Sequence, residues 1–136
     1  MMEDRELVKL AMDMRERAYA PYSGYKVGAA LLAVSGRVYL GCNIENAAFT
    51  PTVCAERTAF FKAVSEGEKE FLGIAIAGGK NGVISGQFPP CGVCRQVMAE
   101  FCGGDFAVLL VSGENEYKKL KFSELLPHSF NPENVG

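Results

Sequence analysis

Strand-like apolar runs alternate with helical patterns along almost the whole chain, and this alternation constrains the fold more than any other feature. The sequence predicts strands at 27–34, 37–44, 71–77, 106–111 and 117–122. Apolar residues at helical spacing, together with helix start and stop signals, predict helices at 3–19, 54–65, 91–102 and 123–126. A strand, helix, strand succession implies parallel neighbours with helices packed on the sheet, which is the α/β class.

Two turns set the direction of particular strand pairs. Ser35-Gly36 is a two-residue turn and predicts a β-hairpin between the first two strands. The last two strands are joined only by the turn at 112–116. A parallel connection needs a dozen residues or more, so this final pair is predicted to be antiparallel.

Length and charge narrow the possible functions. The 136 residues suit a single domain covering 1–136, and the formal net charge is −2. Basic residues are scattered apart from 118–121, which we interpret as a solvated strand edge, so a nucleic-acid partner is disfavoured. The start does not resemble a signal peptide, and no apolar run approaches the roughly 20 residues of a membrane span. We therefore expect a cytoplasmic protein without a membrane partner.

Three of the five cysteines lie at predicted helix starts. Cys91 and Cys94 have the Cys-x-x-Cys spacing that lets two sulfurs hold one Zn²⁺, and Cys54 can supply a third ligand. The free N–H groups of a first helical turn lower the pKa of a thiol, which favours the metal-binding thiolate. Three protein ligands leave one tetrahedral position open, which is typical of a catalytic zinc site.

Two charged residues follow Cys54 directly. Glu56 can reach the open position and move protons there without binding the metal. Three thiolates and Zn²⁺ sum to a formal charge of −1, and Arg57 can draw charge from the sulfurs by hydrogen bonding. A lone Cys-x-x-Cys also fits a redox dithiol or part of a structural zinc site, so the joint pattern carries the prediction.

Cys-Ala-Glu at 54–56, followed by Pro-Cys-x-x-Cys at 90–94, resembles the zinc nucleoside and nucleobase deaminases. The segments 20–23, 27–30, 41–48 and 125–127 fit the short, three-cysteine cytidine deaminases, so the resemblance covers nearly the whole chain. It implies a three-layer fold with a five-stranded mixed sheet flanked by helices. It also implies one zinc per chain, hydrolysis of cytidine and deoxycytidine to their uracil forms and ammonia, and a homotetramer whose active sites are completed by neighbours.

The same resemblance assigns roles to further residues. Asn43 and Glu45 would hold the ribose hydroxyls, and the backbone of Ala55 would contact the base edge. Tyr25 stands where relatives place a Phe that packs on the base, and a tyrosine can still stack. Phe130 matches a C-terminal aromatic that reaches a neighbouring subunit's site in relatives. In the implied mechanism Glu56 carries a proton to ring N3 while hydroxide attacks C4, and then protonates the leaving amino group.

Two competing functions remain open. A related zinc deaminase acting on another cytosine nucleoside, such as blasticidin S, has the same metal chemistry. The segment Asn43-Ile44-Glu45-Asn46 favours a ribose instead. A zinc-stabilised binding module without catalysis would need neither an open ligand position nor Glu56. We interpret Cys42 and Cys102 as ordinary buried thiols and assign His128 no role.

Overall fold

The computed structural model describes residues 2–84 and 86–136 of the chain. Its strands are β1 (Tyr25–Ala33), β2 (Val38–Cys42), β3 (Phe71–Lys80), β4 (Ala107–Gly113) and β5 (Glu116–Lys121). Its helices are α1 (Asp4–Met14), α2 (Ala55–Ser65), α3 (Gly92–Phe101) and α4 (Phe122–Leu125), with 3₁₀ turns at Arg15–Arg17 and Pro132–Asn134.

The strands form one five-stranded sheet in the order β2-β1-β3-β4-β5. The β1–β2 hairpin and the final β4–β5 pair are antiparallel, as predicted from their short connections. The β3-α3-β4 succession gives parallel neighbours, also as predicted. The β2-α2-β3 succession does not, because β1 lies between its two strands and pairs antiparallel with both. The predicted mixed sheet is therefore confirmed.

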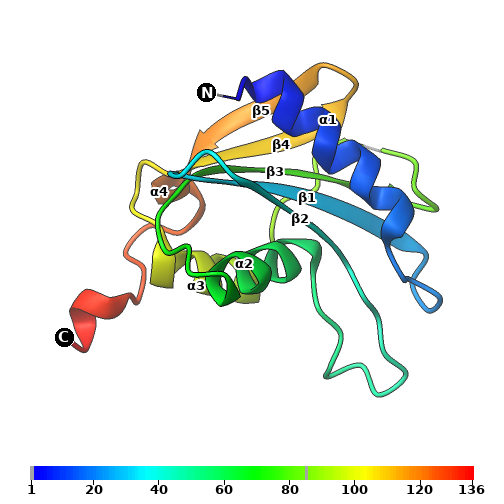
Figure 1. Cartoon of the computed structure of the whole chain (residues 1–136). Helices are drawn as coiled ribbons and strands as arrows, with labels where there is room; N and C mark the ends of the chain where they lie inside the picture. The colour runs from blue at the N-terminus through cyan, green and yellow to red at the C-terminus, as the bar shows by residue number, and fades with distance from the viewer. Residues whose placement is uncertain (1, 85) are drawn as a thin grey trace.

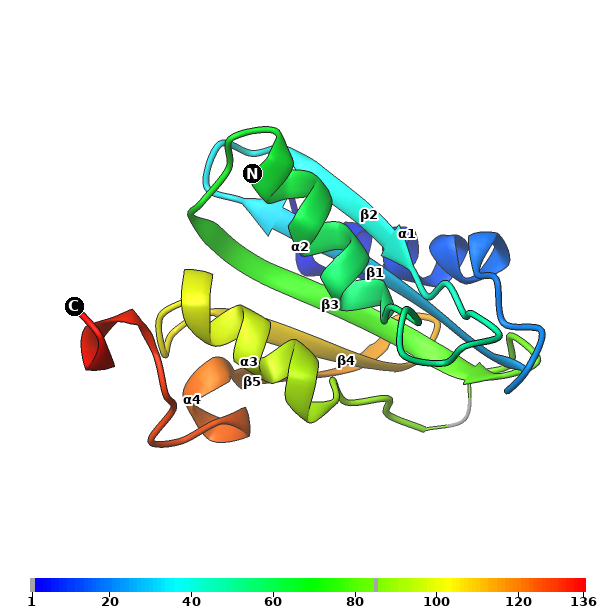
Figure 2. The same ribbon diagram turned by 90° about the horizontal axis from the view of Figure 1, so that it is seen from below.

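Helices cover both faces of the sheet and make a three-layer structure (Figure 1). One core cluster packs α1 against alternate sheet residues, among them Ala30 and Leu32 of β1. The other places α2 and α3 against the opposite face, which includes Ala29 and Leu31. This alternation follows from the two-residue period of a strand, because successive side chains point to opposite faces. Seen from below, α2 and α3 lie side by side on one face with α1 behind the sheet (Figure 2).

Element ends differ from the prediction in several places. The first helix was expected to continue to Tyr19, but α1 ends at Met14 and a 3₁₀ turn follows. Tyr19 instead pairs with Ile44 in an isolated parallel bridge, so the contact with the β2 exit overrides the local helical pattern. The third strand runs past Ala77 to Lys80 because β1 offers pairing partners up to Tyr25. The last helix begins at Phe122, one residue before the expected start.

A close contact between β2 and α2 sets the position of the second helix. A Cβ at Gly41 would lie 2.3 Å from the carbonyl oxygen of Ala55 and 2.6 Å from the amide nitrogen of Ala59. Only glycine leaves room for this approach. The hydroxyl of Thr58 adds a hydrogen bond of 3.0 Å to the carbonyl of Cys42. The first turn of α2 is thereby fixed against the sheet.

Among the described residues, none of the helices combines the length and the apolar composition that crossing a membrane requires.

Candidate metal centre and the adjoining pocket

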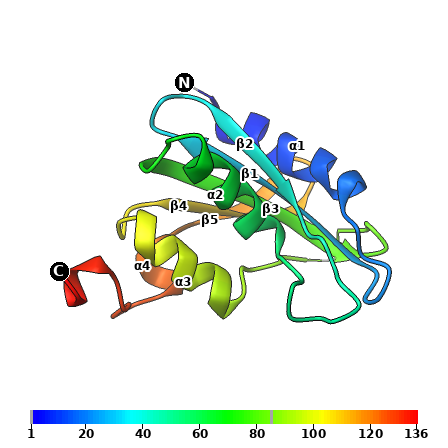
Figure 3. The same ribbon diagram turned by 60° about the horizontal axis from the view of Figure 1, so that its bottom comes forward.

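The structure brings together the three cysteines that the sequence singled out. The Sγ atoms of Cys54 and Cys91 lie 3.7 Å apart, and those of Cys91 and Cys94 lie 3.5 Å apart. All three sulfurs fall within 4.8 Å of one another. α2 and α3 place them there by starting next to each other on one face of the sheet (Figure 3). Two segments that are distant in the sequence thus contribute to one sulfur cluster.

Both helix starts favour negative charge on these sulfurs. Cys54 is the N-cap residue of α2 and Cys91 is the N-cap residue of α3, and neither cap has a side-chain hydrogen bond to the first turn. The first-turn N–H groups and the two helix dipoles, each equivalent to roughly half a positive charge, therefore face the cluster. Hydrogen bonds from the Cys94 thiol and the Arg57 guanidinium lower the pKa of Cys54 to about 5.

Arg57 lies against the cluster as the sequence predicts. Its Nη2 donates a hydrogen bond of 3.4 Å to the Sγ of Cys54. Its Nε is buried without a hydrogen-bond partner among the residues that the structure describes. A buried donor without a partner costs about 1–3 kcal/mol. Metal binding would leave more negative charge on nearby sulfurs than thiols carry, which suits this donor.

The donor set fits a zinc ion. Thiolate sulfurs at helix N-termini are soft, anionic ligands, and a four-coordinate ion can contact three sulfurs at this mutual spacing. Within 2–84 and 86–136, no fourth His, Cys, Asp or Glu joins the group. A site of this kind leaves one coordination position for solvent or substrate, which separates a catalytic site from a structural one.

Glu56 is one of two buried polar residues in the described chain, with 4% of its surface exposed. Burial is the main cause that raises the pKa of its carboxyl to about 7, and the charge of Cys54 adds to the shift. A dication bound by the sulfurs would oppose this shift. A carboxyl whose pKa lies near neutrality can both accept and return a proton at working pH.

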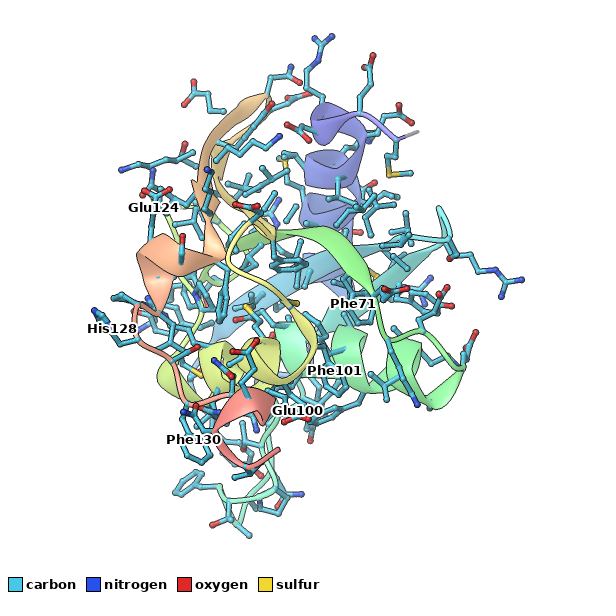
Figure 4. All side chains as sticks on the ribbon, turned by 90° about the vertical axis from the view of Figure 1, so that its left-hand side faces the viewer. Phe71, Glu100, Phe101, Glu124, His128 and Phe130 are labelled. Atoms are coloured by element: carbon cyan, nitrogen blue, oxygen red, sulfur yellow. The ribbon has the colours of Figure 1, made fainter. Side chains whose placement is uncertain are left out.

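A cavity of about 210 Å³ opens beside the sulfurs. Its walls include Tyr25, Asn43, Glu45, Cys54, Ala55, Glu56 and Cys91, so five of the six predicted catalytic and substrate-binding residues meet in one place. The sixth, Phe130, does not line it. Phe130 lies on the C-terminal segment beside α3, with 63% of its surface exposed and its carbonyl accepting a hydrogen bond from Gln96 (Figure 4).

The two predicted sugar ligands are held by the protein itself. The Oδ1 of Asn43 accepts a hydrogen bond of 2.9 Å from the amide of Val27, and its Nδ2 donates one of 2.7 Å to the carbonyl of Tyr25. Glu45 Oε1 accepts backbone N–H groups of Tyr22 and Ser23 at 2.9 and 3.1 Å. Both side chains are therefore fixed on the wall of the cavity.

Phe88 also lines the cavity, although the sequence did not single it out. Its ring lies 6.2 Å from that of Tyr25, at 46°. A Cβ at Gly78 would lie 3.1 Å from the Phe88 ring, so a bare glycine on β3 lets this ring pack close against the strand. The available signal was an aromatic residue just before the Pro89-Pro90-Cys91 segment. Thr52, Val53, Ser23 and Pro89 are further wall residues that were not predicted.

The remaining residues that the sequence singled out do not line the cavity. Cys42 is buried and donates a hydrogen bond of 3.3 Å to the carbonyl of Arg17, and burial raises the pKa of Cys102 to about 12. His128 is exposed on the C-terminal segment (Figure 4). The lysines of β5 are exposed at the sheet edge, where Lys119 pairs with Asp4 at 3.0 Å.

Known proteins resemble this chain in sequence and in fold. Residues 1–110 match the family model for the cytidine and deoxycytidylate deaminase zinc-binding region. The cytidine deaminase of Sporosarcina psychrophila is 46% identical over 99% of this chain and 96% of the relative. A probable cytidine deaminase of Dictyostelium discoideum is 42% identical over 98% of this chain and 90% of its own length.

Solved structures give the same result. The crystal structure of cytidine deaminase from Burkholderia pseudomallei superposes with a TM-score of 0.86 at 42% identity, covering 95% of this chain and 100% of that one. The cytidine deaminase structure from Mycobacterium tuberculosis superposes with a TM-score of 0.79 at 34% identity, covering 96% and 98%. With its three-sulfur cluster and buried glutamate, the chain belongs to the cytidine and deoxycytidylate deaminase zinc-binding family.

Proposed function

We propose that this protein is a zinc-dependent hydrolase that deaminates cytidine and deoxycytidine to uridine and deoxyuridine, releasing ammonia. One observation carries the proposal. The buried carboxyl of Glu56 and the sulfurs of Cys54 and Cys91 line the same small cavity. A proton carrier beside an open metal position is what hydrolytic removal of an amino group needs.

The chemistry divides between the metal and the chain. Zinc held by the three cysteines supplies the Lewis acidity that makes hydroxide available near neutral pH. Glu56 takes the proton from the attacking water and delivers it to N3 of the base, which makes C4 more electrophilic. After the C4–O bond has formed, the same carboxylate takes the remaining proton from the new C4 hydroxyl and passes it to the amino group. The C4–N bond then breaks and the amino group leaves as ammonia. Proton transfer of this kind contributes about 10²–10⁴-fold to the rate.

The other wall residues suit a nucleoside. Tyr25 offers a ring face for the base, and Ala55, which is fully buried, lines the same cavity beside Glu56 and offers its backbone to the base edge. Asn43 and Glu45 provide an amide and a carboxylate for the sugar hydroxyls. Arg57 acts on the sulfurs and not on the substrate, because it donates a hydrogen bond to Cys54 and does not line the cavity.

Assembly and location are part of the same proposal. Residues 1–136 act as one domain, four copies form a homotetramer, and the exposed Phe130 of one copy completes a neighbour's site. The protein works in the cytoplasm in pyrimidine salvage, on free nucleosides and without nucleic-acid or membrane partners. The acidic balance of the chain, with net charge −2, supports a neutral small-molecule substrate.

The test is the loss of cytidine absorbance in the presence of purified protein whose zinc content has been counted. Wild type should turn over cytidine and deoxycytidine with one zinc per chain. Glu56→Gln removes the acid and base function at nearly constant size, so it should keep the zinc and lose turnover. If zinc-loaded wild type leaves both cytidine and deoxycytidine unchanged, the proposal is wrong, and absence of turnover of blasticidin S as well would leave the zinc-stabilised binding module.

Blasticidin S separates the remaining enzymatic alternative. The named relatives favour cytidine, and the Asn43 and Glu45 pair favours a ribose. Turnover of blasticidin S faster than cytidine by the same preparation would overturn this choice of substrate. Ammonia release, measured by a coupled enzyme assay, checks that the absorbance change is a deamination.

A further inference from the structure

The carboxylate of Glu45 is held by one short turn that precedes β1. Its Oε1 accepts the backbone N–H groups of Tyr22 and Ser23, and its Oε2 accepts the hydroxyl of Ser23. The backbone brings the two segments together independently, because Glu45 N donates to the Tyr19 carbonyl at 2.8 Å. Three donors from one turn therefore hold both oxygens of a single carboxylate.

Ser23 also fixes the strand that carries Tyr25. Its Oγ accepts a hydrogen bond of 3.0 Å from the amide of Tyr25 while it donates to Glu45. The Ser23 hydroxyl thus links Tyr25, the proposed contact of the base, to Glu45, the proposed contact of the sugar. Ser23, Tyr25 and Glu45 all line the cavity, so this link lies on the wall of the site.

We propose that Ser23 is a positioning residue that aims the Glu45 carboxylate at one sugar hydroxyl of the substrate; the inference rests on the proposed function. An ionised carboxylate has about four acceptor directions. The turn occupies three of them. About one direction remains free at the cavity, which suits a single hydroxyl donor.

The charge of Glu45 stays available for that donor. Within the described part of the chain, no lysine or arginine forms an ion pair with it. The neutral donors keep it ionised, because the Ser23 hydroxyl and the two backbone N–H groups lower the pKa of Glu45. A hydrogen bond from the substrate to a charged acceptor is about twice as strong as a neutral one.

The decisive experiment compares Ser23→Ala with wild type on cytidine and on 2′,3′-dideoxycytidine, which lacks both ring hydroxyls. Ser23→Ala should raise KM for cytidine about tenfold, or about 1.4 kcal/mol, because a carboxylate that is no longer aimed loses much of its charge-assisted hydrogen bond to the sugar hydroxyl. Its kcat should change less than KM, and its KM for the dideoxy substrate should stay within about twofold of wild type, since no hydroxyl is then read. Ser23→Thr retains the hydroxyl and should restore most of the cytidine KM.

The chain offers a matched control. Ser35 donates a hydrogen bond of 2.6 Å to Glu68 Oε2 and accepts one of 3.3 Å from the amide of Arg37, which repeats the Ser23 arrangement away from the cavity. Ser35→Ala should therefore leave KM for both substrates unchanged. Zinc content and melting temperature of each variant show that the fold is intact, and Ser23 is exposed, so its truncation leaves the core untouched.

The outcomes separate the two proposals. If wild type turns over neither nucleoside, the proposed function fails and this inference falls with it. If wild type is active but Ser23→Ala keeps the wild-type cytidine KM, or raises KM equally for cytidine and dideoxycytidine, only the role of Ser23 is wrong. A failure of Ser23→Thr to recover the cytidine KM would likewise contradict positioning by the hydroxyl.

Discussion

The guanidinium Nη2 of Arg57 lies 3.4 Å from the Sγ of Cys54, and both residues belong to the start of α2. A cation on the first turn thus faces the sulfur of the N-cap residue of the same helix. Three thiolates and a divalent ion would carry a net charge of −1, and we expect the arginine and the two helix N-termini to offset it. Because an electron-rich zinc is a weaker Lewis acid, we expect this compensation to affect both metal retention and catalysis.

Replacing the arginine tests the compensation. Arg57→Gln should lower zinc affinity or kcat by about 10–100-fold, the usual effect of losing a hydrogen bond to a metal ligand. Arg57→Lys keeps the charge without the fixed fork and should recover part of the loss. Chelator competition measures the affinity. Arg15→Gln is a suitable control, since Arg15 donates to the carbonyls of Met12 and Gly82, away from the sulfurs. Unchanged zinc affinity and unchanged activity in Arg57→Gln would refute this role.

A side chain at Gly41 should displace the start of α2. The Cβ of Gly41→Ala would meet the backbone of Ala55 and Ala59. Overpacking of this kind costs typically about 1–3 kcal/mol. We expect a lower free energy of unfolding in urea and a weaker zinc site, because Cys54 and Glu56 move with the helix. Gly103→Ala is the control, because it adds a Cβ in open space at a glycine that, like Gly41, has no positive φ.

The sequence predicted the helix starts and the metal cluster, but it did not predict every helix end or the order of the strands. Helix starts at Cys54 and Cys91 followed from local signals, and the cysteine spacing predicted the metal cluster. The predicted end of the first helix was wrong because Tyr19 pairs with Ile44. Local sequence patterns cannot predict a contact between residues so far apart in the chain. Strand order was unpredictable for the same reason. β1 lies between β2 and β3, which chain order alone does not indicate.

The residues that line the cavity were also predicted only in part. Asn43 and Glu45 were named from a resemblance, but their hydrogen bonds to Val27 and Ser23 depend on packing between separate segments. Phe88 was missed because its place on the wall depends on the bare backbone of Gly78. Local sequence preferences predict helices and strands. The inner surface of a cavity depends instead on contacts between those helices and strands.

Removing zinc should expose some thiols and not others. Cys91 is exposed and the pKa of Cys54 is lowered to about 5, so after chelation both should react rapidly with iodoacetamide at pH 7.5. Burial raises the pKa of Cys102 to about 12, which leaves it a protonated, unreactive thiol at that pH. Peptide mass spectrometry of protein alkylated with and without zinc gives the pattern. Alkylation of Cys102 before Cys91 would contradict the structure.

The acid titration of Glu45 should depend on Ser23. A lowered pKa means that the folded state keeps the carboxylate ionised at pH values where the unfolded chain protonates it. Its stabilising contribution is therefore present above the unfolded pKa and lost as pH falls through the folded pKa. Carboxyl ¹³C NMR should give a pKa below the ordinary value in wild type and a higher one in Ser23→Ala. Ser35→Ala should leave the Glu45 titration unchanged.

X-ray absorption at the zinc edge tests the central claim most directly. Protein purified with its metal should contain one zinc per chain, bound by three sulfurs at about 2.3 Å and by one lighter atom. Glu56→Gln should give the same spectrum in an inactive protein. A fourth sulfur on the metal, or a protein that retains full activity with no zinc, would contradict the open three-cysteine site on which the mechanism depends.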